Sequence, residues 1–161
     1  MDEDALDFVL LAWREEGRWS VEALPARAAT SMETLVHAAR QQPSDGGAIA
    51  MVSVADEFFL VVRVQGDEER ILLSDVAAAA DWDLAREALE RGGIPLPEED
   101  DLDQVQPGGD LHVFADLGVD PTELELVCGD LELYPDEALA RLAARAGFGE
   151  PFDLVDEALP D

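Results

Sequence analysis

Hydrophobic residues recur with two different periods along the first part of the chain, and the change of period separates the predicted elements. Residues 5–13 are mostly apolar, a polar turn containing Gly17 follows, and residues 19–24 alternate between apolar and polar. A period of two predicts a β-hairpin, because successive side chains of a strand point to opposite faces. From residue 30 the apolar residues recur at spacings of three and four, which predicts a helix with one buried face. Thr30-Ser31-Met32-Glu33 has the form of a capping box at its start.

Three short runs of strand-forming residues come next, over residues 48–54, 58–64 and 70–73. Tight acidic turns separate them, so the pattern predicts three consecutive strands of an antiparallel meander. The second run contains Phe58 and Phe59, whose side chains point to opposite faces of a strand. If both faces of the sheet are covered, both side chains are buried. If one face is open, the phenylalanine on it marks an interaction surface.

An alanine-rich stretch then predicts one long helix over residues 76–91, which Ser74-Asp75 caps and Gly92-Gly93 ends. The order of these elements is ββαβββα. We therefore expect an α+β fold, built on an antiparallel sheet of about five strands with two helices.

Residues 96–109 interrupt this pattern, because no apolar period survives there and acidic residues accumulate. Like charges repel one another and extend a chain, so the stretch predicts a flexible acidic linker. A solvated spacer is the simplest interpretation, and a binding segment for a basic partner is the alternative. The carboxylates that would make such a contact are Glu98, Glu99, Asp100, Asp101 and Asp103.

Beyond the linker the sequence becomes helical. Asp120-Pro121 is typical of a helix start with proline at the first position, and Pro135 begins a further helix that Gly147 ends. On the first of these helices we expect Leu126 to face inward with its apolar neighbours. We expect three parts in all: an α+β domain over residues 1–95, the acidic linker over 96–109, and a small all-helical C-terminal subdomain over 110–161.

Charge changes this picture more than any motif does. The 161 residues include 38 Asp and Glu but only 10 basic residues, all of them arginine, for a formal net charge of -28. Residues 1–95 carry -11 of this charge and residues 96–161 carry -17. A chain this acidic repels nucleic acid and anionic membrane surfaces, and it attracts basic protein partners. The lack of lysine also excludes P-loop and Schiff-base chemistry.

Few residues of the types that carry chemistry are present. Cys128 is the one cysteine, which excludes an internal disulfide and any multi-cysteine metal site. His37 and His112 have no nucleophile beside them in the sequence, and Ser74 is expected to cap a helix. No acidic stretch has the spacing of a calcium-binding loop. We therefore expect no catalytic residue, no bound metal and no cofactor.

The first residues and the apolar runs bear on location. The chain begins Met1-Asp2-Glu3-Asp4, the opposite of the basic start of a secretion signal. No apolar run approaches the ~20 residues of a membrane span. We therefore expect a cytoplasmic protein that does not enter the membrane.

Several blocks of residues occur in the same order as in a known family. They lie at residues 57–64, 72–75, 107–111, 115–118 and 146–148. With these blocks, and over about residues 8–152, the chain resembles the actinobacterial family of tRNA adenosine deaminase-associated proteins. That family takes its name from association with the gene for the zinc-dependent enzyme that converts adenosine to inosine in tRNA. The resemblance carries over no catalytic residue, and the chain lacks the paired cysteines with which such a deaminase binds zinc.

Together these observations favour a non-enzymatic accessory or adaptor protein that binds a basic protein partner through its acidic surface. The resemblance makes tRNA adenosine deaminase the candidate partner, and a polyanion that competes with tRNA is the sharper version of this hypothesis. Two alternatives stay open. One is a homodimeric module that pairs through an edge strand or through the sheet face of Phe58 and Phe59. The other is a small-molecule-binding or catalytic domain of unknown chemistry.

Overall fold

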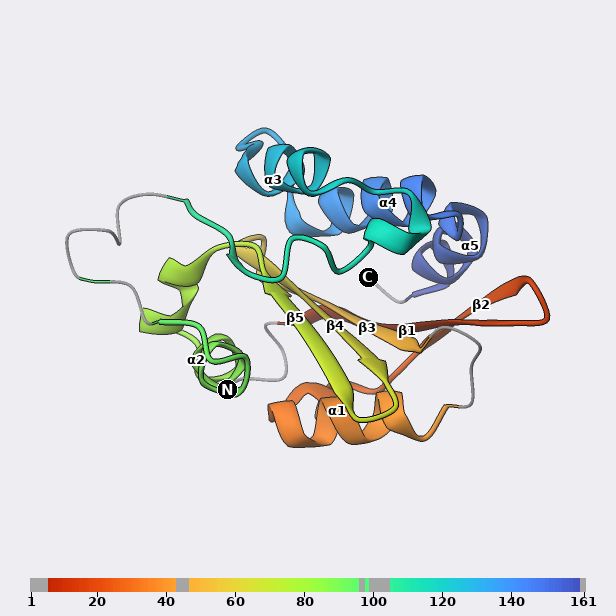
Figure 1. Ribbon diagram of the computed structural model, residues 1–161, viewed down its shortest axis with the longest axis horizontal. Helices are drawn as coiled ribbons and strands as arrows, with labels where there is room; N and C mark the ends of the chain where they lie inside the picture. The colour runs from red at the N-terminus through yellow and green to blue at the C-terminus, as the bar shows by residue number, and fades with distance from the viewer. Residues whose placement is uncertain (1–5, 43–46, 96–97, 99–104, 160–161) are drawn as a thin grey trace.

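The computed structural model describes residues 6–42, 47–95, 98 and 105–159. Its centre is an antiparallel sheet of six strands in the order β2-β1-β3-β4-β5-β6 (Figure 1). The sheet confirms the predicted α+β class and adds one strand to the five expected. The strands are β1 (Leu6–Glu15), β2 (Arg18–Ala23), β3 (Ala48–Val54), β4 (Phe58–Gln65), β5 (Glu68–Leu73) and β6 (Gly108–Gly109).

The predicted hairpin and meander are both present in this sheet. β1 and β2 are joined through Glu16 and Gly17, whose positive φ angles of 52° and 79° match the tight turns that favour the twist of a hairpin. β3, β4 and β5 are successive neighbours. β1 pairs with β3 on its other side, so hairpin and meander form one continuous sheet.

Helices cover both faces of the sheet, which gives the molecule three layers (Figure 1). Two helices lie against one face. Three helices from the C-terminal part lie against the other, so this part packs directly on the sheet. The helices are α1 (Met32–Arg40) and α2 (Asp83–Arg91) on the first face, and α3 (Pro121–Gly129), α4 (Pro135–Ala146) and α5 (Gly149–Ala158) on the second.

Each face has its own apolar core, and the alternation of side chains along the strands assigns residues to them. On β4, Phe58 and Leu60 belong to the core under α1 and α2, whereas Phe59 and Val61 belong to the core under α3, α4 and α5. All four side chains are at most 2% exposed. A strand buried on both faces needs apolar residues at every position, which explains the near-continuous apolar runs of β3 and β4.

The start of α1 differs in detail from the predicted capping box. Ser31, not Thr30, is the N-cap, because its Oγ accepts a hydrogen bond from the N–H of Thr34 at 3.1 Å. Thr34, not Glu33, completes the box by accepting from the N–H of Ser31 at 3.3 Å. The helix therefore begins one residue later than the motif suggests.

The single helix expected over residues 76–91 is wrong, because the chain forms two helices there. A 3-10 helix, η3 (Val76–Ala80), comes first, and α2 begins only at Asp83. Between them Trp82 has an extended backbone, with φ −126° and ψ 121°. Its indole Nε1 donates to a carboxylate oxygen of Glu57 at 2.6 Å, and its ring centroid lies 6.0 Å from that of Phe58. These two contacts with the β3–β4 region hold the break in place.

In α3 the predicted N-cap is confirmed, and the predicted inward position of Leu126 is wrong. Asp120 caps α3 as predicted, by accepting from the N–H of Thr122 at 2.8 Å. Leu126, however, is 70% exposed and does not face inward. Leu124, Val127 and Cys128 fill the inward side, and a residue two positions after Leu124 lies on the opposite side of the helix.

Part of the predicted linker belongs to the sheet. β6 pairs with the end of β5, and Gln106 accepts a hydrogen bond from the N–H of Val76 at 2.9 Å. A Cβ atom on Gly109, which has φ 110°, would lie 2.0 Å from the carbonyl oxygen of Ile71, so this approach requires glycine. The division of the chain at residues 95 and 109 stays a prediction. Every helix in the described ranges falls short of a membrane span in its length or in its apolar character.

Candidate interaction site

Both faces of the sheet are covered, so the first of the two alternatives for Phe58 and Phe59 holds: both are buried, and as candidate interaction residues they are corrected. Phe58 is 0% exposed in the core under α1 and α2, and Phe59 is 2% exposed in the core under α3, α4 and α5. The sequence pattern placed them on opposite faces correctly. The pattern did not show that α3, α4 and α5, which come from residues far along the chain, cover the second face.

The acidic candidates of the linker lie mostly outside the described residues. Glu98 is described and is exposed. Glu99, Asp100, Asp101 and Asp103 fall outside the described ranges. Their role as a contact for a basic partner stays a prediction.

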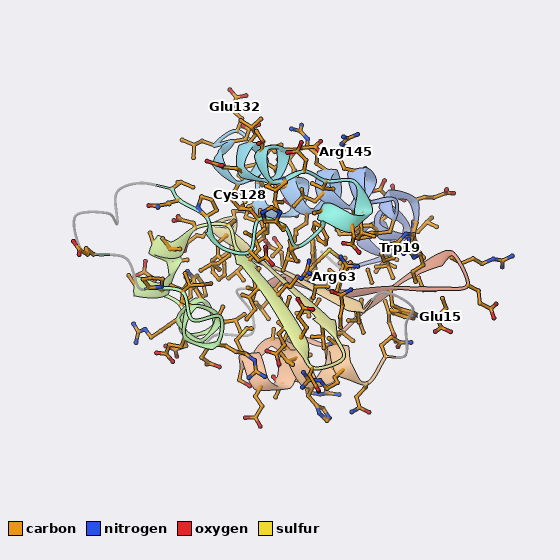
Figure 2. The ribbon with its side chains drawn as sticks, viewed as in Figure 1. Glu15, Trp19, Arg63, Cys128, Glu132 and Arg145 are labelled. Carbon is orange, nitrogen blue, oxygen red and sulfur yellow. The ribbon has the colours of Figure 1, made fainter. Side chains whose placement is uncertain are left out.

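The candidate nucleophiles are held in structural roles. Burial, and to a smaller extent the charge of Glu125, raises the pKa of the Cys128 thiol to about 12, so the thiol stays protonated at neutral pH. Figure 2 shows Cys128 between α3 and the sheet. The Oγ of Ser74 accepts a hydrogen bond from the N–H of Phe59 at 2.9 Å and is buried with it. His37 and His112 are both exposed, on opposite sides of the sheet.

A groove opens beside Cys128, where three connections that are distant in sequence meet. It lies between the β3–β4 turn, the connection from β5 to η3, and the loop between α3 and α4, and it holds about 140 Å³. We call it the α3–α4 groove. Leu131 and Val105 lie at its border and are 79% and 44% exposed. A hollow beside α5 has a larger volume of about 540 Å³ and is more open to solvent.

The rim of the α3–α4 groove carries four carboxylates and no basic side chain among its described lining residues. They are Asp56 and Glu57 on the β3–β4 turn, Asp75 before η3, and Asp130 after α3. Local hydrogen bonds orient three of them. Glu57 accepts from Trp82, Asp75 accepts from the N–H of Ala77 at 3.0 Å, and Asp130 accepts from the N–H of Glu132 at 3.0 Å. The groove therefore combines exposed apolar side chains with fixed negative charge.

A buried arginine on β4 joins the beginning of the C-terminal layer to the sheet. Arg63 projects from β4 and is 1% exposed (Figure 2). Its guanidinium donates to both carboxylate oxygens of Asp116, with Nη2 3.0 Å from Oδ2, and to the carbonyl oxygen of Val113 at 3.0 Å. Burial raises the pKa of Asp116, but the hydrogen bond and the charge of Arg63 outweigh it and lower the pKa below its usual value. The pair is a structural tie, because Asp116 stays ionised against a paired cation.

The outer surface of the C-terminal layer is strongly acidic. Residues 110–159 contain thirteen Asp and Glu but only two arginines. Arg145 on α4 is paired with Glu123 on α3, its Nη2 lying 3.3 Å from Oε2 (Figure 2). Burial raises the pKa of Asp156 on α5, and the negative charges of Asp136 and Asp153 raise it further. Burial and the neighbouring negative charges together therefore disfavour ionisation of the Asp156 carboxyl.

Among the described residues, no three His, Cys, Asp or Glu side chains come together as ligands for a metal. The prediction that the protein needs no metal or cofactor is not tested by this observation. The four carboxylates of the α3–α4 groove come from three different connections.

Comparison with known proteins identifies the family. Residues 7–149 match the family described as Rv3753c-like tRNA adenosine deaminase-associated protein. The chain is also similar to Protein Rv3753c of Mycobacterium tuberculosis, with 35% identity over 148 residues that cover 91% of this chain and 85% of the relative. The chain belongs to the Rv3753c-like family. This confirms the resemblance seen in the sequence blocks. No solved structure matches the chain.

In this Rv3753c-like protein, sequence patterns missed the α3–α4 groove. Leu131 and Leu133 stand in a short stretch between Gly129 and Pro135, which respectively end and begin helices. Leucines in a connection of six residues or fewer are a weak signal, because connections usually lie on the surface and are polar. Nothing in the sequence indicates that Asp56 and Asp75 lie next to this connection.

Proposed function

We propose that this protein is a non-enzymatic adaptor that binds a basic protein partner through its acidic surface, and that it acts in the cytoplasm. The observation that carries the proposal is the α3–α4 groove, where the exposed side chains of Leu131 and Val105 lie together with four carboxylates. An apolar surface with a charged rim is typical of a protein interaction site. An anionic rim selects a partner segment in which an apolar residue is flanked by arginine or lysine.

The net charge of -28 supports the same class of partner at longer range. Opposite charge accelerates the encounter of two proteins and suppresses association with acidic ones, and the effect weakens as salt screens it. The family description makes tRNA adenosine deaminase the first candidate for the partner. An enzyme that acts on tRNA must present a positively charged surface to its substrate. Such a surface is complementary to the negative charge of this protein.

The test is a titration of the full-length chain with purified tRNA adenosine deaminase from the same organism, followed by calorimetry at low and high salt. We expect a complex whose affinity falls at least tenfold between the two conditions. If no complex forms at low salt, tRNA adenosine deaminase is excluded as the partner. Competition between the chain and tRNA for the deaminase would favour the polyanion version of the proposal, and simultaneous binding of both would favour a plain adaptor.

A matched pair of variants tests the groove itself. Leu131→Ser removes an exposed apolar side chain from the groove, whereas Leu154→Ser removes one from α5, outside it. Both leucines are more than half exposed, so neither change should unfold the protein. We expect Leu131→Ser to weaken binding roughly tenfold, as the loss of one buried leucine implies, and Leu154→Ser to leave it unchanged. Equal effects of the two variants would contradict the assignment to the groove.

A further inference from the structure

β2 is the last strand of the sheet, and one of its edges faces away from the other strands. In the described part of the chain its one strand neighbour is β1, with which it pairs from Arg18 to Ala23. β2 lies at the outer end of the sheet beneath α5, as Figure 1 shows. A strand edge of this length is a template on which another strand can pair.

The hydrogen bonding with β1 determines which backbone groups of β2 face outward. Leu24 donates its N–H to Val9 at 2.8 Å, so residues of the same parity as Leu24 turn their backbone groups toward β1. In an antiparallel strand the intervening residues turn theirs the other way. The N–H and C=O groups of Trp19, Val21 and Ala23 therefore point outward from the sheet.

The side chains of β2 form two rows, one on each face. Arg18, Ser20 and Glu22 are exposed and lie in one row. Trp19 and Val21 lie in the other and are half-buried against the core under α3, α4 and α5. The Trp19 ring has two close contacts, with the Phe148 ring at 4.7 Å between centroids and with the guanidinium of Arg14 at 5.3 Å. The outward edge is thus an ordered strand.

We infer that a second copy of this chain pairs with β2 in antiparallel orientation, about a twofold axis at Ser20. This register sets Trp19 opposite Val21 of the second copy, and these two residues exchange hydrogen bonds through their outward backbone groups. It also sets Arg18 opposite Glu22 of the second copy. The twofold axis repeats each pair, so two opposite-charge pairs and two Trp–Val pairs form at once.

Neighbouring registers lack this complementarity. Pairing centred on Val21 sets Glu22 against Ser20, and Arg18 against a leucine. Pairing centred on Glu22 sets the two Glu22 side chains against each other, which is repulsive. Charged residues on an edge strand usually prevent pairing with other sheets. Here the two charges have opposite sign and equal distance from Ser20, so they favour this self-pairing over the two neighbouring registers.

The net charge of the two copies acts against this dimer. Two bodies of -28 repel one another at long range, and salt screens that repulsion over about 10 Å at 0.1 M. The backbone hydrogen bonds and the Trp–Val contacts are short-range and survive screening. The dimer therefore strengthens as salt rises, which is the opposite of binding to a basic partner. The two processes can be told apart by this sign alone.

A cysteine placed on the axis tests the register. The two Ser20 residues would form a non-hydrogen-bonded pair with Cα atoms about 4.5 Å apart, within the range that a disulfide spans. The two Glu22 residues would be offset by four positions, or about 13 Å, which a disulfide cannot span. Under mild oxidation we expect Ser20→Cys to form a covalent dimer and Glu22→Cys to stay largely monomeric. Cys128 is buried and serves as the same background in both variants.

A charge exchange tests the pairing without any crosslink. Glu22→Arg makes each copy less acidic, so a general effect of charge would strengthen the dimer. In the proposed register, however, the new arginine lies opposite Arg18 of the second copy, and this repulsion weakens the dimer. Glu132→Arg is the matched control, because it makes the same change of charge in the loop between α3 and α4, far from Trp19 on β2 (Figure 2). We expect Glu132→Arg to strengthen the dimer.

The double variant Arg18→Glu with Glu22→Arg restores both pairs at unchanged net charge, and we expect it to dimerise like the original chain. Sedimentation equilibrium at several salt concentrations measures all four proteins. A chain that stays monomeric at every salt and protein concentration would overturn the inference. Dimerisation that Glu22→Arg does not weaken, or crosslinking of Glu22→Cys in place of Ser20→Cys, would overturn it equally.

Discussion

The carboxylate of Glu87, on α2, accepts a hydrogen bond from the backbone N–H of Met32 at the start of α1, at 3.0 Å and across 55 positions of sequence. The first turn of a helix has N–H groups without partners, and a nearby negative charge also interacts favourably with the helix dipole. One side chain thus completes the cap of a neighbouring helix and joins the two helices of the first layer.

We predict that Glu87→Ala lowers the free energy of unfolding by about 1 kcal/mol, the usual cost of losing a helix cap. Thermal and urea unfolding measure it. Glu87→Gln is the control, because its amide oxygen still accepts the bond, and it should retain more than half of the stability lost by the alanine variant. If the two variants lose the same amount, the contribution is one of charge and not of the hydrogen bond.

The Arg63–Asp116 pair should make stability depend on pH in the acid range. The pKa of Asp116 is lowered in the folded protein, so its contribution is complete above the ordinary value of 3.8 and is lost as pH falls through the lower folded value. We predict that Asp116→Asn costs about 1 kcal/mol at neutral pH, a modest amount because the carboxylate is half-exposed. Urea unfolding at a series of pH values measures this. The difference between variant and original should shrink as the solution becomes more acidic than the ordinary pKa.

The contribution of Asp156 to stability should change with pH in the opposite direction to that of Asp116. Burial and the neighbouring acidic side chains raise its pKa in the folded protein. Its contribution to stability is therefore complete below the ordinary value of 3.8 and is lost as pH rises through the raised value. We predict that Asp156→Asn stabilises the protein at neutral pH by less than about 1 kcal/mol and has no such effect in acid. A melting temperature that falls in the variant at neutral pH would contradict this.

Cys128 should react slowly in the folded protein. A thiol with a pKa of about 12 is almost entirely protonated at pH 8, and its side chain is buried. We predict that alkylation by iodoacetamide at pH 8 is at least a hundredfold slower in the folded chain than in urea, where the thiol regains its ordinary pKa. Mass spectrometry over time measures the labelled fraction. Rapid labelling of the folded protein would show that the Cys128 thiolate is accessible, and Cys128 would again be a candidate nucleophile.

Local pattern predicted those parts of the fold that depend on short-range physics. The hairpin follows from a two-residue period around Gly17, and the opposite placement of Phe58 and Phe59 follows from strand geometry. The break at Trp82 could not be predicted in this way, because alanine favours helix on both sides of it. Its extended backbone is held by Glu57 and Phe58, which lie about 25 positions earlier.

The candidate site depends on long-range contacts, and this is why the sequence did not indicate it. Asp56, Asp75 and Leu131 each lie in a connection with no distinctive motif, and they meet only after α3 and α4 have packed on the sheet. The cover over Phe59 has the same origin, since it comes from residues beyond position 110. The total charge, by contrast, is a sum over residues and is available from the sequence alone.

The short β6 strand changes how a break in the chain would act. It fixes residues 106–109 at the edge of the sheet, through the pairing with β5 and the hydrogen bond from the N–H of Val76 to Gln106. The chain before residue 96 supplies five strands, and the chain after residue 104 supplies the sixth strand and the second core's helical cover. Two fragments produced by a single proteolytic cut between these positions would share one continuous apolar interface. They should remain associated after the peptide bond is gone, and should reassemble when mixed as separate polypeptides.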